Sequence, residues 1–561
     1  MQTSMPAFDT HEVTNQPAPF ENVNLFLCDP ALMAALEREG GGAAAAELSA
    51  LGAQLGGAGV LELARLANEH GPRLRNFDRG GRRVDEIEFH PAWHELMRLL
   101  IENGAHSSAW DGAPGAQVAR AAKYLLFGQV ENGSQCPVTM TYAAVAALRH
   151  APRLAARWLP KILSREYDPR PLPVAQKRGA LVGMGMTEKQ GGSDVRANTT
   201  RAAPVPPSEA RALFGEEGED VYRLVGHKWF FSAPQSDAHL VLAQTGDDGG
   251  TGPSCFLVPR ILPDGARNQI RVQRLKDKLG NRSNASSEVE FTGAYGWLLG
   301  ERGRGIPTIL EMGGHTRLDC VLGSAGAMRA ALTHALHHAR QREAFGRKLS
   351  EHPLMRNVLA DLALESEAAT ALSLRLARCF DEIADPAQAM LARILTPAGK
   401  YWVCKRGPGF GAEAMEVIGG SGYVEESPLA RLYREFPVNS IWEGSGNVMC
   451  LDLLRAFAKS PAAAEALGAE LALAGGDAAH ARYTAALLAD LRQGTRDEYG
   501  ARLLAERIVL AVQAGLLLRH APAFVSGAFV ATRLAREPGG AYGRLPAGVD
   551  CGAILERALP Q

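Results

Sequence analysis

A single carboxylate stands between bulky apolar residues and small flexible ones in residues 441–447, which read IWEGSGN. Ile441 and Trp442 predict an apolar wall, and desolvation beside such a wall makes the carboxylate of Glu443 a stronger base. Gly444 carries no side chain, so backbone there can approach a flat ligand closely. Removal of a weakly acidic C–H proton requires a base of this kind. The segment predicts a general base, although a surface turn with an ordinary glutamate also fits these seven residues.

Three further segments carry groups suited to an aromatic, anionic ligand. Residues 186–194 (MTEKQGGSD) supply glycines, hydroxyls and backbone N–H groups that can hold a ring edge or a pyrophosphate. Residues 226–232 (GHKWFFS) form an aromatic strand that ends in a hydroxyl, and barrel core is the ordinary alternative for its rings. Residues 340–346 (RQREAFG) place guanidinium groups and a phenyl ring at a helix end, where a planar guanidinium can pair with phosphate.

The composition is that of a large globular protein with balanced charge. The chain has 561 residues, enough for several domains, and its 60 Lys and Arg nearly cancel 61 Asp and Glu. This balance argues against a surface made mainly for nucleic acid. The eight cysteines are scattered without a C-x-x-C pair, which indicates a reducing compartment. No secretory signal and no run of roughly 18 apolar residues are visible, so we expect a cytoplasmic protein without a membrane span.

Apolar periodicity divides the chain into a helical, a β-rich and a second helical region. Repeats at three to four residues dominate the first and last parts, and short β-rich runs separated by Gly, Pro, Asp and Asn fill the centre. This order predicts an α+β fold, and no G-x-G-x-x-G follows a strand as a dinucleotide-binding βαβ unit would require. The domains that we expect are an N-terminal helical domain at 1–180, a central antiparallel β-barrel domain at 181–297, a four-helix bundle at 298–455 and an additional helical domain at 456–561.

Taken together, these segments resemble the acyl-CoA dehydrogenase family of flavoproteins, in order and spacing along most of the chain. Two of the resemblances are to signature patterns of that family. They lie in residues 186–194 and in a stretch that runs from Glu416 through the glycines at 419–422 to Arg431 and Glu435. Within the family, four segments are similar to the AidB branch, which belongs to the adaptive response to DNA alkylation: residues 184–195, 225–232, 275–284 and 439–447.

The resemblance implies an acyl-CoA dehydrogenase-like fold and bound FAD. The cofactor would lie extended between the β domain and the C-terminal helices and would be shared across a subunit boundary, in a homotetramer built as a dimer of dimers. The cofactor-binding residues that the resemblance implies are Met186, Thr187, Gln190, Gly191, Gly192, Ser193, Phe230, Phe231, Ser232, Ile441, Trp442, Gly444, Ser445 and Asn447, with Arg342, Phe345, Gly419 and Gly420 reaching the FAD of a neighbouring subunit.

The family reaction implied is α,β-dehydrogenation of an acyl-CoA thioester, with Glu443 at the position of the catalytic base. Some branches carry the base on the helix that here contains residues 315–317, but no acid stands there. Arg317 and Arg455 are the predicted substrate-binding residues. Arg455 could also pair with Glu443 and weaken it as a base, so the expected dehydrogenase activity is weak or redirected.

Two other kinds of site have less support. His334, His337 and His338 include an i, i+4 pair, but no carboxylate or cysteine accompanies them, so no metal is predicted. The AidB branch is linked to DNA through its C-terminal region, which suggests a DNA-binding protective protein as the alternative function. Residues 456–561 hold eleven Lys and Arg against ten acids, so double-stranded DNA is a plausible partner only if the cations gather on one face.

Overall fold

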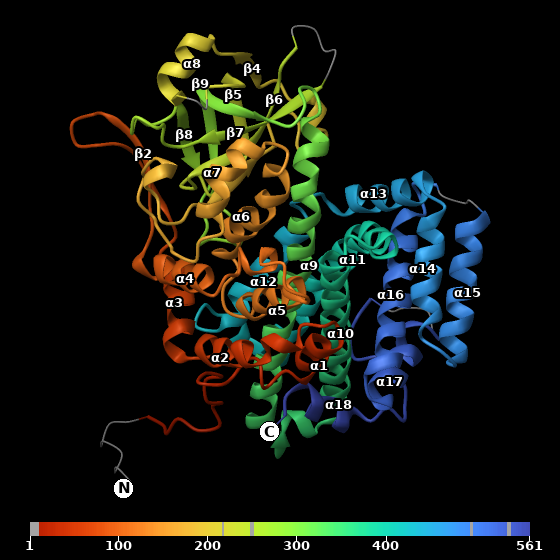
Figure 1. Cartoon of the computed structure of the whole chain (residues 1–561). Coiled ribbons are helices and arrows are strands. Elements are labelled where there is room, and N and C mark those ends of the chain that lie inside the picture. The colour runs from red at the N-terminus through yellow and green to blue at the C-terminus, as the bar shows by residue number, and fades with distance from the viewer. Residues whose placement is uncertain (1–9, 216–217, 247–251, 494–496, 536–539, 561) are drawn as a thin grey trace.

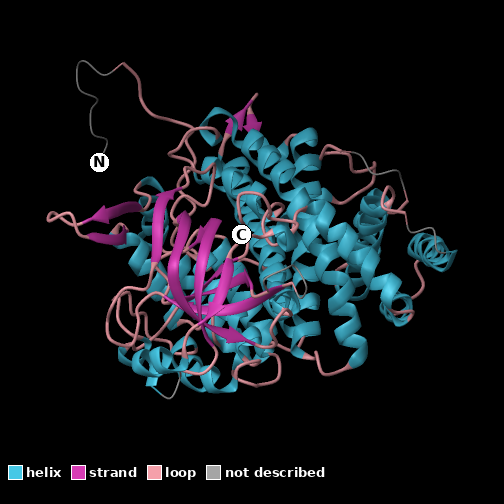
Figure 2. Cartoon of the chain, turned by 90° about the horizontal axis from the view of Figure 1, so that it is seen from above, coloured by secondary structure: helices cyan, strands magenta, loops and turns pink. Residues whose placement is uncertain are grey.

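The structure, a computed structural model, consists of a β domain that stands at one end of a long helical body (Figure 1). It describes residues 10–215, 218–246, 252–493, 497–535 and 540–560. Seen from above, the sheet lies to one side of the helices, and further helices extend away from it on the opposite side (Figure 2). None of the helices in these described ranges combines the length and apolarity needed to cross a bilayer.

The N-terminal region is helical, as predicted, except for one hairpin. Strands β1 and β2 pair antiparallel and project beside the β domain (Figure 1). Leu74 and Ile87 pack against the core of that domain, and the Asn76 side chain donates to the Val272 carbonyl at 2.7 Å. The prediction of helix was wrong for this hairpin, because the residues of the β domain against which its polar strands pack lie far away in sequence. The elements are α1 (Pro30–Arg38), α2 (Ala45–Leu55), α3 (Ala58–Glu69), β1 (Arg73–Phe77), β2 (Arg83–Glu88), α4 (Pro91–Glu102), α5 (Ala116–Gly128), α6 (Gln135–Leu148) and α7 (Pro152–Ile162).

The central region forms a closed barrel. Strands β6, β4, β5, β9 and β7 pair in turn and β7 pairs back with β6, while β3 joins β6 and β8 joins β9. Most of these ladders are antiparallel, as predicted, but β3 and β4 both run parallel to β6. The elements are β3 (Val182–Gly185), β4 (Arg201–Pro204), α8 (Pro207–Phe214), β5 (Val221–Ser232), β6 (Ala238–Gln244), β7 (Pro253–Pro259), β8 (Ile270–Leu275) and β9 (Ser286–Leu299).

Helix α9 connects the β domain to the far end of the helical body. It has 37 residues, which span about 55 Å at 1.5 Å per residue. Gly326 allows α5 to approach, because a Cβ there would lie 2.5 Å from the Leu125 carbonyl oxygen. The bundle consists of α9 (Gly305–Gln341), the hairpin β10 (Glu343–Ala344) and β11 (Arg347–Lys348), α10 (Pro353–Asp381), α11 (Pro386–Ile418), α12 (Pro428–Asn439) and α13 (Gly446–Lys459).

The C-terminal helices pack directly on the bundle. Their buried residues belong to one hydrophobic cluster with those of the N-terminal helices and the bundle, including Leu100, Leu364 and Leu510. Arg533 adds buried ion pairs to Asp361 and Glu365 of α10. The additional region therefore shares its core with the bundle. It contains α14 (Ala462–Ala472), α15 (Ala478–Gln493), α16 (Ala501–His520), α17 (Ala523–Arg533) and α18 (Cys551–Ala558).

Replacing Arg533 by Met should destabilise the whole helical body. The change leaves Asp361 buried without its guanidinium partner, and breaking a buried pair costs about 3–5 kcal/mol. Denaturant unfolding should show a lower midpoint and a single transition, because the core is continuous. Arg65→Met, which breaks an exposed pair with Glu62, is the control and should leave the midpoint unchanged. A separate early transition of the C-terminal helices would contradict a shared core.

Candidate active site

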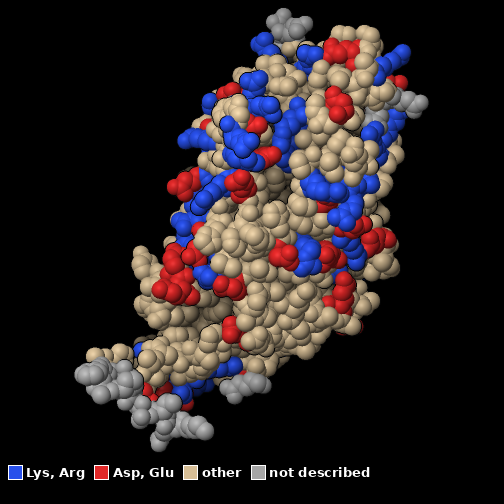
Figure 3. Space-filling view, turned by 90° about the vertical axis from the view of Figure 1, so that its left-hand side faces the viewer, with Lys and Arg blue, Asp and Glu red and all other residues tan. Residues whose placement is uncertain are grey.

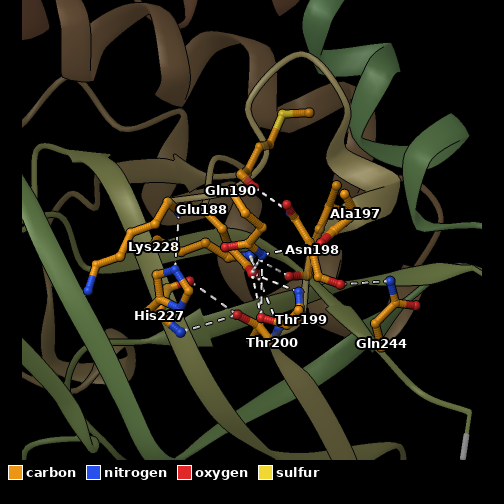
Figure 4. Close-up of polar contacts among 12 residues, drawn as sticks. Glu188, Gln190, Ala197, Asn198, Thr199, Thr200, His227, Lys228 and Gln244 are labelled. Carbon is orange, nitrogen blue, oxygen red and sulfur yellow. Dashed lines mark hydrogen bonds and ion pairs between the residues drawn. The ribbon is translucent and has the colours of Figure 1, made fainter.

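A buried carboxylate organises the loop that follows β3. Glu188 accepts from the Lys228 ammonium at 2.7 Å, from the Thr199 amide at 2.7 Å and from the Thr200 amide at 3.1 Å (Figure 4). The Thr187 carbonyl in turn accepts from the Trp229 amide at 2.9 Å. These contacts fix Met186 and Thr187 alongside the end of β5, where Ser232 lies.

The charge of Glu188 is stabilised by its surroundings. Burial alone would disfavour the ionised form, but the Lys228 ammonium and the hydrogen-bond donors outweigh it and hold the pKa of Glu188 at about 2. Burial lowers the pKa of Lys228 to about 8, which still leaves the ammonium charged at neutral pH. The pair is therefore an ion pair inside the protein, with both side chains fully buried.

Glu443 lies on an irregular segment between α12 and α13, on backbone that non-glycine residues rarely adopt. Its φ is +58°, and that of Gly444 is +105°. A Cβ on Gly444 would approach the flexible end of the Met449 side chain (Cε) to 2.4 Å, so the backbone conformation is the main reason for glycine there. The Glu443 carboxylate accepts from the Thr316 hydroxyl of α9 at 2.6 Å.

One buried and one partly buried cation hold the carbonyls of this segment. Lys400 of α11 donates to the Trp442 carbonyl at 2.6 Å and also to the Gly444 carbonyl. The Arg317 Nε donates to the Glu443 carbonyl at 3.0 Å, while its Nη1 pairs with Asp452 of α13 at 3.0 Å. Long helices thus anchor the backbone on both sides of the carboxylate.

The β-domain and helical parts of the site meet at Cys136 of α6. Burial raises the pKa of its thiol to about 12, and the smaller influences on it include the charge of Glu443 and hydrogen bonding with Ser232. Met186 and Trp442 pack against the same hydrophobic cluster, to which Cys136 belongs. Ser232 therefore lies beside Cys136, and Met186 and Trp442 border the hydrophobic cluster that contains it.

Several predicted contacts take a different form in the structure. Phe231 is fully buried, and its ring stacks on His239 in the barrel core, so this ring does not face the site. Phe230 is 53% exposed and its ring is accessible. Ile441 is 65% exposed, which leaves Trp442 alone as the apolar wall beside Glu443. The Gln190 amide donates to Glu188 at 2.7 Å and so takes part in the loop's own hydrogen bonds.

The remaining predicted residues of segments 186–194 and 441–447 are Gly191, Gly192, Ser193, Ser445 and Asn447. Gly191 is buried and closes the turn, with its amide 3.2 Å from the Glu188 carbonyl, whereas Gly192 and Ser193 are exposed. Ser445 is the N-cap residue of α13. The Asn447 side chain accepts from Arg502 at 2.9 Å.

The expectation that Arg455 could pair with Glu443 was wrong, and the substrate-binding roles of Arg317 and Arg455 stay predictions. Arg455 is exposed on α13 and forms no ion pair with Glu443 within the described residues, because Thr316 takes that place instead. The guanidinium of Arg317 is used by the Glu443 carbonyl and by Asp452. The contacts of the two arginines follow from the helices that carry them, which are α9 for Arg317 and α13 for Arg455.

Four predicted residues lie away from Glu443. Arg342 and Phe345 are at the far end of α9 and in the β10–β11 turn, and Phe345 is 97% exposed. Gly419 and Gly420 lie in the exposed turn after α11, where a Cβ would meet nothing within 4 Å. Their distance from Glu443 within one chain is what a contribution to a neighbouring subunit requires.

Comparison with known proteins assigns the family. The middle and C-terminal domain models of acyl-CoA dehydrogenases match residues 183–294 and 303–458, and the model of the adaptive response protein AidB N-terminal domain matches residues 15–169. The AidB protein of Escherichia coli K12 is 58% identical over 455 residues, which cover 81% of each chain. The chain belongs to the acyl-CoA dehydrogenase family, in its AidB branch.

Solved structures of relatives show the same acyl-CoA dehydrogenase architecture. The crystal structure of Caenorhabditis elegans ACDH-11 in complex with C11-CoA has a TM-score of 0.82 and 28% identity, and covers 100% of this chain and 94% of that one. The apo-form of Bd2924 has a TM-score of 0.81 and 30% identity, and covers 91% of this chain and 100% of that one. The N-terminal helical, middle β and C-terminal helical arrangement is thus that of the family.

Sequence reasoning did not identify four residues that build this acyl-CoA dehydrogenase site. Glu188 and Lys228 lie inside the motifs at residues 186–194 and 226–232, where other ionisable residues stand beside them and nothing singles them out. Lys400 and Thr316 lie in long helical stretches, where no local pattern distinguishes them. Among the described residues, no group of His, Cys, Asp and Glu could hold a metal ion.

Replacing Lys228 by Met should unfold the β-domain half of this site. It leaves the Glu188 carboxylate buried and uncompensated, at a cost of about 3–5 kcal/mol in the free energy of unfolding. The double variant with Glu188→Gln should recover part of that loss, because no buried charge remains. Denaturant unfolding of the parent, the two single variants and the double variant measures this coupling.

The stabilising effect of Glu188 should depend on pH in a defined direction. Its pKa is lowered from 4.5 to about 2, so its contribution is present above about pH 4.5 and is lost as the pH falls toward 2. The stability difference between the parent and Glu188→Gln should therefore shrink from pH 5 to pH 3. A difference that stays constant over this range would contradict an ionised Glu188.

Proposed function

We propose that this chain is an FAD-dependent acyl-CoA dehydrogenase in which Glu443 removes the α-proton of an acyl-CoA thioester. The observation that carries the proposal is the Glu443 carboxylate, which the Thr316 hydroxyl anchors on backbone held by Lys400 and Arg317. The complex of the ACDH-11 relative with C11-CoA supports an acyl-CoA as the substrate class.

The residues available on the β-domain side fit a flavin. The Phe230 ring is accessible for stacking on a flat ligand. The Thr187 hydroxyl makes no hydrogen bond in the described part of the chain, and the Ser232 hydroxyl lies 3.4 Å from the Ser286 hydroxyl and next to the Cys136 thiol. Both hydroxyls can therefore bond to the polar edge of the ring. Phe230, Thr187, Ser232 and Met186 are the residues that we expect to hold it.

The hydride acceptor in this chemistry is the flavin of FAD. The contribution of the chain is to place a base beside the substrate's α-carbon and to exclude water. The Thr316 hydroxyl donates to the Glu443 carboxylate and leaves the second oxygen available to take the proton. Trp442 donates its indole N–H to Asn439 at 3.0 Å, which fixes its ring as a wall of the pocket. General-base catalysis of this kind contributes about 10²–10⁴-fold to a rate.

An oligomer with shared FAD sites follows from the same proposal. Arg342 at the end of α9 and Phe345 in the turn after it lie far from Glu443, and Phe345 exposes 97% of its surface. Such an exposed ring suits contact with a ligand held by another subunit. We propose a homotetramer in which these two residues and the turn at Gly419 and Gly420 complete the neighbour's cofactor site.

The DNA-binding alternative stays a prediction, and no observation favours it specifically. In the C-terminal region, Arg507, Arg519, Arg533 and Arg557 are engaged with carboxylates of the helical body or of neighbouring helices. On the face in Figure 3, Lys and Arg gather over the upper part, but acids lie among them. Among the ion pairs of the β domain and the β1–β2 hairpin are Arg274 with Glu288 and Arg267 with Glu86.

Glu443→Gln should abolish dehydrogenation while leaving the cofactor bound. The FAD-loaded protein is mixed anaerobically with isovaleryl-CoA or with C11-CoA, and bleaching of the flavin absorbance gives the rate. We expect a loss of about 10²–10⁴-fold, because the amide cannot accept the α-proton. Bleaching of the variant at the parent rate would contradict the role of Glu443.

Arg455→Ala provides the matched control and tests the earlier expectation of a weakened base. Since Arg455 is exposed and Glu443 is held by Thr316 instead, the bleaching rate should stay within about twofold of the parent, which is less than 0.5 kcal/mol. A large rise in the rate would show that Arg455 restrains Glu443 in solution.

A further inference from the structure

The carbonyl groups of three successive residues, Trp442, Glu443 and Gly444, all accept hydrogen bonds from side chains. Lys400 donates to the carbonyls of Trp442 and Gly444, and Arg317 donates to the carbonyl of Glu443 between them. Carbonyls of an irregular segment have no helix or strand partner, and buried ones need a donor. Two cations from two different helices supply these donors.

The ammonium group of Lys400 forms its hydrogen bonds with this loop. Lys400 is 1% exposed, and within the described residues it forms no ion pair with a carboxylate. A buried ammonium without a carboxylate is stabilised by the dipoles of the carbonyls that it contacts. The two carbonyls flank Glu443, so the ammonium fixes the backbone immediately before and after the base.

Arg317 ties the same loop to three helices. Its Nη1 pairs with Asp452 of α13, and Asp452 also pairs with Arg393 of α11 at 2.6 Å. The residue before it on α9, Thr316, donates to the Glu443 carboxylate at 2.6 Å. One turn of α9 therefore fixes both the main chain and the side chain of Glu443.

This fixation is needed because the backbone of Glu443 is strained. Its φ of +58° lies in the left-handed region, where a side chain with a Cβ is disfavoured and persists only if the surroundings impose it. Without the two cations, the loop can relax to the ordinary region, and the carboxylate then moves away from Thr316. A displacement of about 1 Å at a reacting group can cost about 10²-fold in rate.

We propose that Lys400 and Arg317 are positioning residues that hold Glu443 in its left-handed conformation and so aim its carboxylate at the substrate. The inference rests on the proposed function of Glu443 as the base. It gives Lys400 and Arg317, which lie outside the sequence motifs, a role in the geometry of catalysis. Neither residue performs this role by touching substrate or cofactor.

The test compares Lys400→Gln, Arg317→Gln and Lys400→Arg in the FAD-loaded protein. One readout is the rate of flavin bleaching by isovaleryl-CoA, and the second is hydrogen exchange of the backbone amides in residues 440–450. We expect Lys400→Gln to lower the rate by about 10²-fold, to leave the Kd for isovaleryl-CoA unchanged, and to speed exchange in that segment. Lys400→Arg keeps the charge and the donors and should restore most of both.

Lys177→Gln is the matched control. Lys177 is also a 1% exposed lysine whose ammonium donates to two carbonyls, those of Asp168 and Arg170, and it also pairs with Asp237. Its loss should lower stability as much as that of Lys400, yet leave the rate and the exchange of residues 440–450 unchanged. An equal effect of both variants would mean a general loss of folding and would overturn the proposal.

Hydrogen exchange separates this proposal from the proposed function. Unchanged exchange of residues 440–450 in Lys400→Gln overturns the positioning role, whether or not the protein turns over isovaleryl-CoA. If the parent protein does not bleach, or if Glu443→Gln bleaches equally fast, the proposed function fails, and the exchange result still decides whether the cations hold the loop. Arg317→Gln carries the same two readouts if Lys400→Gln does not accumulate as folded protein.

Discussion

The geometry of the site depends on satisfying backbone that has no regular hydrogen-bonding partner. Glu443 stands between two helices, and the carbonyls of residues 442–444 would be buried without donors if Lys400 and Arg317 were absent. A lone buried cation is costly in protein interiors, but one that replaces several missing donors stabilises the segment around it. The long helices α9 and α11 supply these cations because both run beneath the loop.

The β-domain side is built on the same principle with the charges reversed. The loop after β3 turns around a buried carboxylate, Glu188, and the donors that satisfy it come from β5 and from the residues that lead into β4. Both halves of the site are thus irregular segments whose backbone is organised by a buried charge. On the helical side the charges come from α9 and α11, whereas on the β-domain side Glu188 stands in the loop itself and Lys228 in β5.

The C-terminal helices illustrate why charge counts alone say little about partners. Eleven Lys and Arg against ten acids in residues 456–561 suggested a neutral region, and the structure explains where much of that charge is used. Arg533 and Arg557 bind carboxylates of α10, and Arg519 binds Glu470 of α14. These arginines fasten the region to the bundle, so they contribute to its core more than to a free basic surface.

The sequence by itself determined the α+β plan, the barrel and the family, and it singled out Glu443 as the candidate base, because periodicity and short motifs are local properties of the chain. It did not predict the β1–β2 hairpin, whose apolar partners lie on the β domain, or the burial of Phe231 within the barrel rather than at the site. Only the tertiary structure decided that Thr316, and not Arg455, holds the carboxylate, and that Lys400 and Arg317 support its backbone. These contacts join residues from 42 to 127 positions apart, as Lys400 to Trp442 and Thr316 to Glu443 illustrate, and no local pattern encodes which helix will pass beneath a loop.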